Sequence, residues 1–155
     1  MIVFGKTTPG ISTAPFLIKA EEREGNEIKF VVALPVCGER GEGGEKTRHS
    51  KLDGLLRKAA PIYADKNERY EIAFPRYVLH MTRNESYTCW DDYEIRRGDY
   101  FILFDRSRLL DHVPQIVGEE IVNLHYPHGY KHYGIYCQNH IVDIIAAEEP
   151  EIKKL

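Results

Sequence analysis

The sequence predicts an α+β domain built mainly from an antiparallel sheet that is curled or closed into a small barrel, with one principal helix at about 50–60. Short runs of alternating apolar and β-branched residues, separated by turn residues, recur along the chain. One segment combines a helix-start signal with apolar residues at helical spacing. The length of 155 residues fits a single domain, spanning 1–155, with one hydrophobic core.

The first predicted element is a β-hairpin between residues 16 and 34. Two apolar runs flank a charged tip that contains Gly25 and Asn26, a pair that tolerates positive φ in tight turns. The segment 37–49 that follows is rich in glycine and charge. Because such a composition cannot pack into a core, we expect a mobile surface loop there.

The principal helix is predicted to begin at Ser50, which is followed three positions later by an acidic residue, as in a capping box. Apolar residues recur on one face of this segment, and Pro61 ends it. We therefore expect Leu52, Leu55 and Leu56 to lie in the core.

The second half of the chain is predicted to form further strands at 70–74, 77–81 and 100–104, and a hairpin over 131–144. Between these strands, the sequence predicts a short helix over 89–94. The stretch 116–124 is compatible with a strand or a short helix. The last residues, 148–155, are expected to form a charged tail.

The predicted hairpin at 131–144 closes through the two-residue turn Gln138-Asn139. Because residues that flank such a turn pair in order, His132 and Asp143 should lie opposite each other or one register apart. This pairing predicts a basic imidazole with a carboxylate to orient it.

Composition sets broad limits on location and partners. The net charge of −3 arises from mixed acidic and basic residues, so the bulk charge does not indicate a polyphosphate partner. Three cysteines without framework spacing favour free thiols in a reducing, cytoplasmic compartment. We expect no secretory signal and no membrane span, because the chain contains no apolar run of about 18 residues.

Cys89, His132 and Asp143 are the candidate catalytic residues. A cysteine nucleophile needs a base to accept its proton and a third group to hold the imidazole. Cys89 would begin the short helix, where the helix dipole lowers a thiol pKa. The structural alternative is that Cys89 and Trp90 are buried apolar residues beside a turn and that His132 is a surface or satisfied strand histidine.

Two runs of sequence also resemble a known superfamily. The runs 97–104 and 131–136 read RGDYFILF and KHYGIY. They resemble the Gly-Asp strand and the histidine strand of the papain-like NlpC superfamily, in particular the H-box of lecithin retinol acyltransferase-like proteins and of certain picornaviral non-structural proteins. The resemblance implies a base at His132 and an orienting residue at Asp143. It implies a thiol hydrolase or acyltransferase acting on a small-molecule, lipid or peptide substrate without a cofactor, or a catalytically inactive descendant.

Two other functions are compatible with the sequence. A small β-rich module could bind single-stranded nucleic acid or a protein, with basic and aromatic side chains contacting phosphates and bases. The residues for this role are Arg97, Arg106, Arg108, Tyr130 and Lys131. A histidine-rich stretch with His125 and His128 offers weaker candidates for metal ligands, although we expect no metal to be required.

Overall fold

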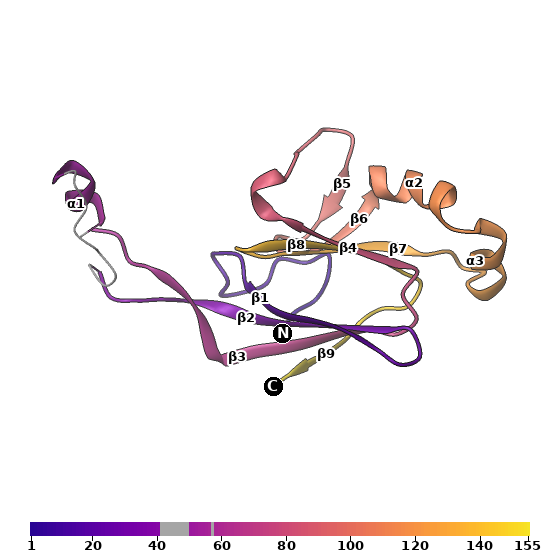
Figure 1. The fold of residues 1–155 in the computed structure, drawn as a ribbon, viewed down its shortest axis with the longest axis horizontal. Coiled ribbons are helices and arrows are strands. Elements are labelled where there is room, and N and C mark those ends of the chain that lie inside the picture. Colours follow the sequence, from indigo (N-terminus) through magenta and orange to yellow (C-terminus); the bar gives the residue numbers. More distant parts are fainter. Residues whose placement is uncertain (41–49, 57) are drawn as a thin grey trace.

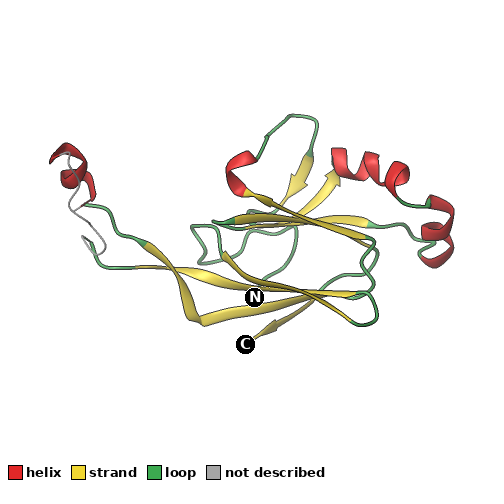
Figure 2. Cartoon of the chain, viewed as in Figure 1, coloured by secondary structure: helices red, strands yellow, loops and turns green. Residues whose placement is uncertain are grey.

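The protein consists of two antiparallel sheets that lie face to face, with helices at the periphery (Figures 1 and 2). The computed structural model describes residues 1–40, 50–56 and 58–155. One sheet has the strand order β1-β2-β3-β9 and the other the order β4-β8-β7-β6-β5. The prediction of an α+β fold dominated by antiparallel strands is confirmed. The sheets remain separate layers and do not close into a barrel.

The elements follow one another along the chain in a simple order. They are β1 (Phe16–Arg23), β2 (Glu27–Cys37), α1 (Ser50–Leu56), β3 (Ile62–Phe74), β4 (Leu79–Asn84), the 3-10 helix η1 (Glu85–Tyr87), β5 (Ile95–Arg97), β6 (Phe101–Arg106), α2 (Arg108–Ile116), α3 (Glu119–His125), β7 (Lys131–Tyr136), β8 (His140–Ala146) and β9 (Glu151–Lys154).

The first hairpin, β1–β2, is confirmed, with Gly25 at φ 79° and Asn26 at φ 58° in its turn. Strands β2 and β3 then continue past the facing sheet as a two-stranded arm, in which Cys37 pairs with Ile62 (Figure 1). The expected loop at 37–49 therefore begins at the end of β2, and its residues 41–49 lie outside the described part of the chain.

Helix α1 lies at the end of this arm, away from both sheets (Figure 1). The expectation that it fills the core is wrong, because Leu52 is 43% exposed and Leu55 is 66% exposed. The arm carries the helix away from both sheets, so the core between the sheets does not cover Leu52 and Leu55. The side chain of Leu56 lies outside the described residues.

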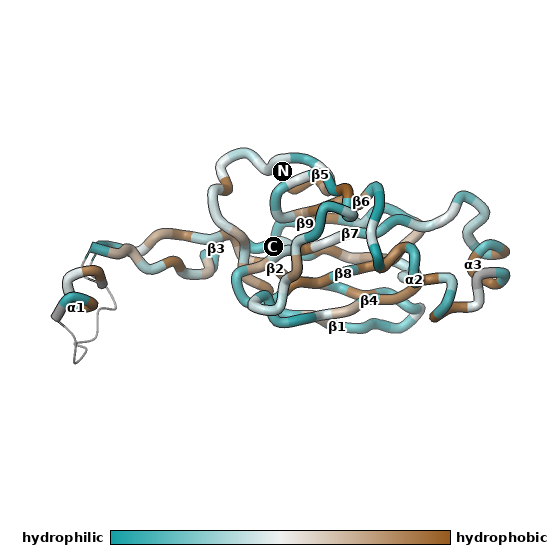
Figure 3. Tube along the Cα trace, turned by 90° about the horizontal axis from the view of Figure 1, so that it is seen from above, coloured by the Kyte–Doolittle hydropathy of each residue, from teal (hydrophilic) through white to brown (hydrophobic). Residues whose placement is uncertain are grey.

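The hydrophobic core fills the space between the two sheets. Alternate residues of each strand point inward, as the pleat requires, and apolar stretches run along these strands in Figure 3. The largest fully buried side chains of this interior come from both sheets: Phe30, Ile72, Phe74, Phe101, Tyr133, Ile135 and Ile144.

The opposite face of the five-stranded sheet carries a second apolar cluster, which includes Ile102, Phe104 and Tyr136. Helix α2 lies on this side of the sheet (Figure 1). No helix was predicted over Arg108–Ile116, and α2 forms there although Pro114 lies inside it. The following segment, for which strand and helix were both open, forms α3.

Two other expectations are corrected. The helix expected over 89–94 is absent, because η1 already ends at Tyr87 and the chain then runs without a helix to β5. The expected charged tail instead contributes β9, whose Ile152 pairs with Ile72 of β3. Within the described ranges, no helix has the length and apolar character needed to cross a membrane.

Candidate functional site

A buried pair of polar residues, His132 on β7 and Asp143 on β8, lies on the outer face of the five-stranded sheet. The β7–β8 turn is the predicted one, with Cys137 N donating to His140 O at 2.8 Å. In the resulting register His132 pairs with Ile145, and Asp143 pairs with Gly134. His132 and Asp143 are therefore diagonal neighbours two positions out of register, not directly opposite or one position apart as expected, and His132 Nε2 lies 3.1 Å from Asp143 Oδ1. Each residue is 2% exposed.

Ser107 occupies the other nitrogen of the imidazole, with its Oγ 2.8 Å from His132 Nδ1. Ser107 is also the N-cap of α2, and its Oγ accepts a hydrogen bond from Leu110 N at 3.0 Å. The hydroxyl proton is then available for donation to Nδ1. This arrangement suits the neutral tautomer in which Nε2 carries the proton and donates it to Asp143.

The imidazole is also held by stacking. The ring of Phe104 lies parallel to that of His132, with 4.0 Å between ring centroids and 6° between planes. Gly134 makes this packing possible, because a Cβ there would lie 3.2 Å from Phe104 Cε2 and 3.0 Å from Tyr136 Cε1. The ring of His132 is therefore fixed on its face and at both nitrogens.

Arg83 of β4 supplies the charge that balances Asp143. Its Nη2 lies 3.4 Å from Asp143 Oδ2, in a pair with one nearly buried member. Among the described residues, Oδ2 of Asp143 and Nε of Arg83 are both buried without a hydrogen-bond partner. Oδ1 of Asp143 thus accepts a hydrogen bond from the imidazole, whereas Oδ2 is stabilised only by the nearby positive charge of Arg83.

A pocket of about 550 Å³ opens above this pair. Its apolar wall includes Leu79, Met81 and Ile116, and its polar groups include Arg83, Glu94 and Arg108. Asp91 on the rim is held by Arg108, whose Nε donates to Asp91 Oδ2 at 2.6 Å.

The three candidate catalytic residues all line this pocket: Cys89, His132 and Asp143. Cys89 is exposed and lies in the loop between η1 and β5, so the helix N-terminus expected to activate its thiol is not there. Both ring nitrogens of His132 already have partners, Ser107 and Asp143. Cys89 therefore lines the same pocket as a histidine whose hydrogen-bonding positions are filled.

Sequence reasoning missed Ser107, Phe104 and Arg83. A local signal for Ser107 was present: a serine stands directly before a segment with apolar residues at 109, 110 and 113, a pattern typical of a capped helix. Arg83 and Phe104 gave no local signal, because their roles depend on the pairing of β4 with β8 and of β6 with β7.

The residues expected to bind nucleic acid are largely engaged with neighbouring groups. Arg97 forms two hydrogen bonds with Asp105, at 2.9 and 2.7 Å. Arg106 donates to the carbonyl oxygen of Tyr93 at 2.6 Å, and Arg108 is bound to Asp91.

The remaining two residues of that set lie at the start of β7. Lys131 lies 3.3 Å from Glu149, and Tyr130 is half-buried just before the strand. Of the four basic side chains proposed to contact nucleic acid, Arg97, Arg108 and Lys131 are therefore paired with a neighbouring carboxylate.

The weaker metal candidates also have definite places. His125 ends α3, and His128 lies in the turn that follows it. Over the part of the chain that the structure describes, no three side chains of the metal-binding types gather closely enough to hold an ion.

Comparison with known proteins identifies no relative. Neither a family model, nor a curated protein, nor a solved structure is similar enough to this chain to count as a match.

Proposed function

We propose that this chain is a small-molecule-binding domain in which the His132–Asp143 pair forms the floor of the pocket and does not act in catalysis. It would then correspond to the catalytically inactive form of a papain-like domain. The observation that carries this proposal is the hydrogen bonding of His132, whose Nδ1 and Nε2 both face buried partners. A general base needs a nitrogen that can take a proton from the reacting group.

Ser107 does not replace Cys89 as a nucleophile in this proposal. Its side chain is fully buried, it caps α2, and it is not among the residues that line the pocket. A substrate in the pocket would have to displace α2 to reach it. The Ser107–His132–Asp143 chain therefore works as an internal polar network that holds β7, β8 and α2 together.

The pocket has the size and composition of a small-molecule site. A lining that combines apolar side chains with charged groups suits an amphipathic ligand, such as a fragment of a lipid or a peptide. Arg83, whose Nε has no hydrogen-bond partner among the described residues, can bind an anionic head group, and Met81 and Leu79 can pack against an apolar tail.

A second candidate function, a thiol hydrolase or acyltransferase, is favoured by one observation: Cys89 lines the same pocket as His132. In that reaction the Cys89 thiolate attacks the carbonyl carbon of an ester, the alcohol leaves, and water hydrolyses the resulting thioester. His132 would have to release the Ser107 hydroxyl from Nδ1, its unprotonated nitrogen, before it could accept the thiol proton.

Ester turnover separates the two candidates. We expect p-nitrophenyl acetate hydrolysis by the protein to be slow, without a burst, and unaffected by Asp143→Asn. A burst of about one equivalent of p-nitrophenol that is lost in Cys89→Ser and in Asp143→Asn would instead establish the thiol enzyme.

Binding is tested with 8-anilino-1-naphthalenesulfonate, an amphipathic anion that becomes fluorescent in apolar sites. The binding proposal expects saturable fluorescence that Met81→Glu abolishes. Val36→Glu, an equally drastic change on the distant arm, is the matched control and should leave the titration unchanged, since Val36 is 44% exposed and outside the pocket. Fluorescence that does not saturate, or that both variants remove, would contradict the proposal.

A further inference from the structure

A second cavity, of about 450 Å³, lies on the opposite face of the five-stranded sheet. The N-terminal residues, the inner face of β6 and β7, and β9 enclose it. Its inner wall is apolar and includes Ile2, Phe4, Leu103 and Ile152. Because successive residues of a strand point to opposite faces, Tyr133 faces this cavity and His132 faces the first pocket.

Tyr133 brings one polar atom to this apolar space. The residue is 2% exposed, and among the described residues its hydroxyl has no hydrogen-bond partner. Its ring is fixed by edge contacts with Phe4 and Phe74, with centroids 5.3 and 5.2 Å away. An unpaired buried hydroxyl is costly to the fold, so its retention calls for an explanation beyond packing.

The phenol of Tyr133 is a hydrogen-bond donor over the whole physiological range. Burial first, and the negative charge of Glu149 second, raise the pKa of Tyr133 to about 12. Tyr133 and Glu149 both line the cavity, so the phenol lies next to this space. A ligand would therefore meet a neutral O–H group.

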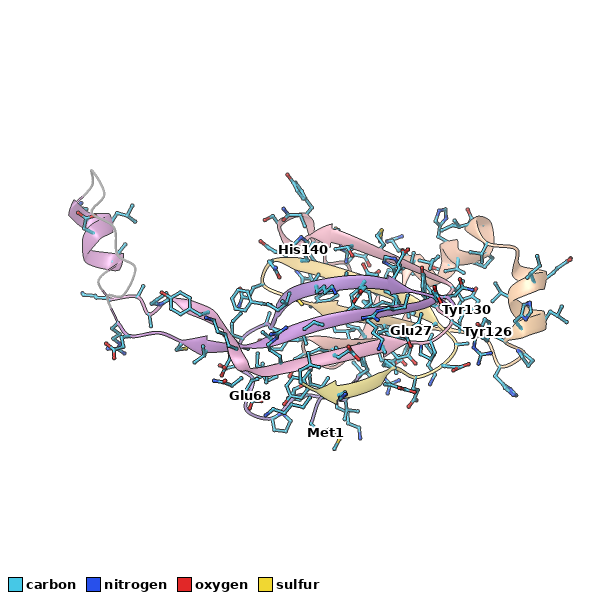
Figure 4. The ribbon with its side chains drawn as sticks, turned by 60° about the horizontal axis from the view of Figure 1, so that its bottom comes forward. Met1, Glu27, Glu68, Tyr126, Tyr130 and His140 are labelled. Atoms are coloured by element: carbon cyan, nitrogen blue, oxygen red, sulfur yellow. The ribbon has the colours of Figure 1, made fainter. Side chains whose placement is uncertain are left out.

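Two charged side chains, Lys6 and Glu149, line the cavity together with the apolar ones. Both are exposed, and Glu149 Oε1 lies 3.3 Å from Lys131 Nζ, so its charge is balanced by a neighbour. Met1 and Val3 of the lining are exposed as well, and Figure 4 shows Met1 close to β9. The buried lining residues, Ile2 and Tyr133, carry no charge, which favours a neutral ligand.

We propose that this cavity is a binding site for a neutral, mostly apolar molecule with one hydrogen-bond acceptor, such as a ketone or an ester, whose oxygen accepts the Tyr133 hydroxyl proton. The apolar wall takes up the hydrocarbon part, and Tyr133 fixes the position of the acceptor. This site is separate from the pocket above His132, so it does not depend on the function proposed for that pocket.

Two probes of similar shape test the acceptor. Butyrophenone has a ketone oxygen and butylbenzene has none. Binding of each is measured by calorimetry to the full chain and to Tyr133→Phe, which removes only the hydroxyl. We expect butyrophenone to lose up to about tenfold in affinity in Tyr133→Phe, the effect of one neutral hydrogen bond. Butylbenzene should bind both proteins equally.

His112→Ala, a change at an exposed residue of the other pocket, is the control for location and should leave butyrophenone binding unchanged. The proposal is overturned if butyrophenone shows no saturable binding at millimolar concentration. It is also overturned if Tyr133→Phe binds butyrophenone as tightly as the parent does, or if His112→Ala abolishes the binding. Thermal unfolding of Tyr133→Phe verifies that the variant is folded, and we expect its stability to be equal or higher.

Discussion

His132 and Asp143 are joined by a 3.1 Å hydrogen bond although they are not partners in the β7–β8 ladder. Diagonal neighbours in a sheet are about 7–8 Å apart at the backbone, so only a long side chain can bridge them. The bridge is possible here because the residue directly opposite Asp143 is Gly134, which has no side chain to occupy the space. The polar pair thus depends on a glycine as much as on its own two residues.

Removal of the imidazole is expected to destabilise the fold strongly. In His132→Leu, Asp143 loses the only hydrogen bond that the described residues give its carboxylate, and the buried charge keeps Arg83 as its only ion-pair partner. Breaking a buried pair in this way costs about 3–5 kcal/mol. Urea unfolding followed by circular dichroism measures the change in the free energy of unfolding.

Two companion variants identify the cause of that loss. The double variant His132→Leu with Asp143→Leu should recover part of the stability, because it removes the unpaired charge as well. Ser107→Ala should cost less than His132→Leu, about 1–2 kcal/mol, since it removes a helix cap and one neutral hydrogen bond. A cost below about 1 kcal/mol for His132→Leu would show that the pair is not structural.

Gly134→Ala is expected to disturb the stacking of Phe104 on His132. The added Cβ would lie 3.0 Å from Tyr136 and 3.2 Å from Phe104, both closer than ordinary contact. Overpacking of this kind costs about 1–3 kcal/mol, and thermal unfolding should show a lower midpoint.

The matched control is Gly54→Ala in α1, where an added Cβ would meet no atom of the described residues within 4 Å. Alanine is the better helix former by about 0.5–1 kcal/mol, so this substitution should leave stability unchanged or raise it. If Gly134→Ala likewise causes no loss of stability, the crowding around Gly134 is relieved without cost.

The sequence predicted those parts of the structure that local pattern determines. The β1–β2 hairpin follows from its turn residues, and the juxtaposition of His132 with Asp143 follows from a two-residue turn and the regular pleat. Once the turn at Gln138-Asn139 is assigned, the pairing of every residue along β7 and β8 is determined.

The remaining features depend on contacts between segments that are distant in sequence. The apolar spacing in α1 indicates which face is apolar, but whether another surface covers that face depends on how far β2 and β3 extend. The role of Ser107 depends on α2, which forms despite Pro114 because Val113 is fully buried beneath it. No pattern near Cys89 reveals that its loop closes over the sheet and lines the pocket.

Alkaline pH is expected to destabilise the protein through Cys137. This thiol is 5% exposed in the core between the sheets, and burial raises its pKa from 9.0 to about 12. The folded state therefore keeps a proton that the unfolded chain releases. The stabilisation is fully present below pH 9 and is lost as the pH rises towards 12, by about 1.4 kcal/mol per pH unit for one such group.

The variant Cys137→Ala should distinguish the pH-dependent contribution of the Cys137 thiol to stability from its contribution through packing. The variant loses stability at every pH because it leaves a small cavity, but between pH 9 and 12 its free energy of unfolding should fall less steeply than that of the parent. Tyr133 and Tyr136, whose pKa values burial also raises to about 12, account for part of the slope that remains above pH 10.

The measurement is urea unfolding at pH values between 8 and 11 in the presence of a reducing agent. Cys89→Ser, which removes an exposed thiol, is the control and should keep the full slope of the parent protein. If Cys137→Ala and the parent show the same slope between pH 9 and 11, the thiol of Cys137 is not held protonated by the fold. The alkaline loss of stability would then have to arise from the buried tyrosines alone, and Tyr133→Phe and Tyr136→Phe would be the variants that reduce it.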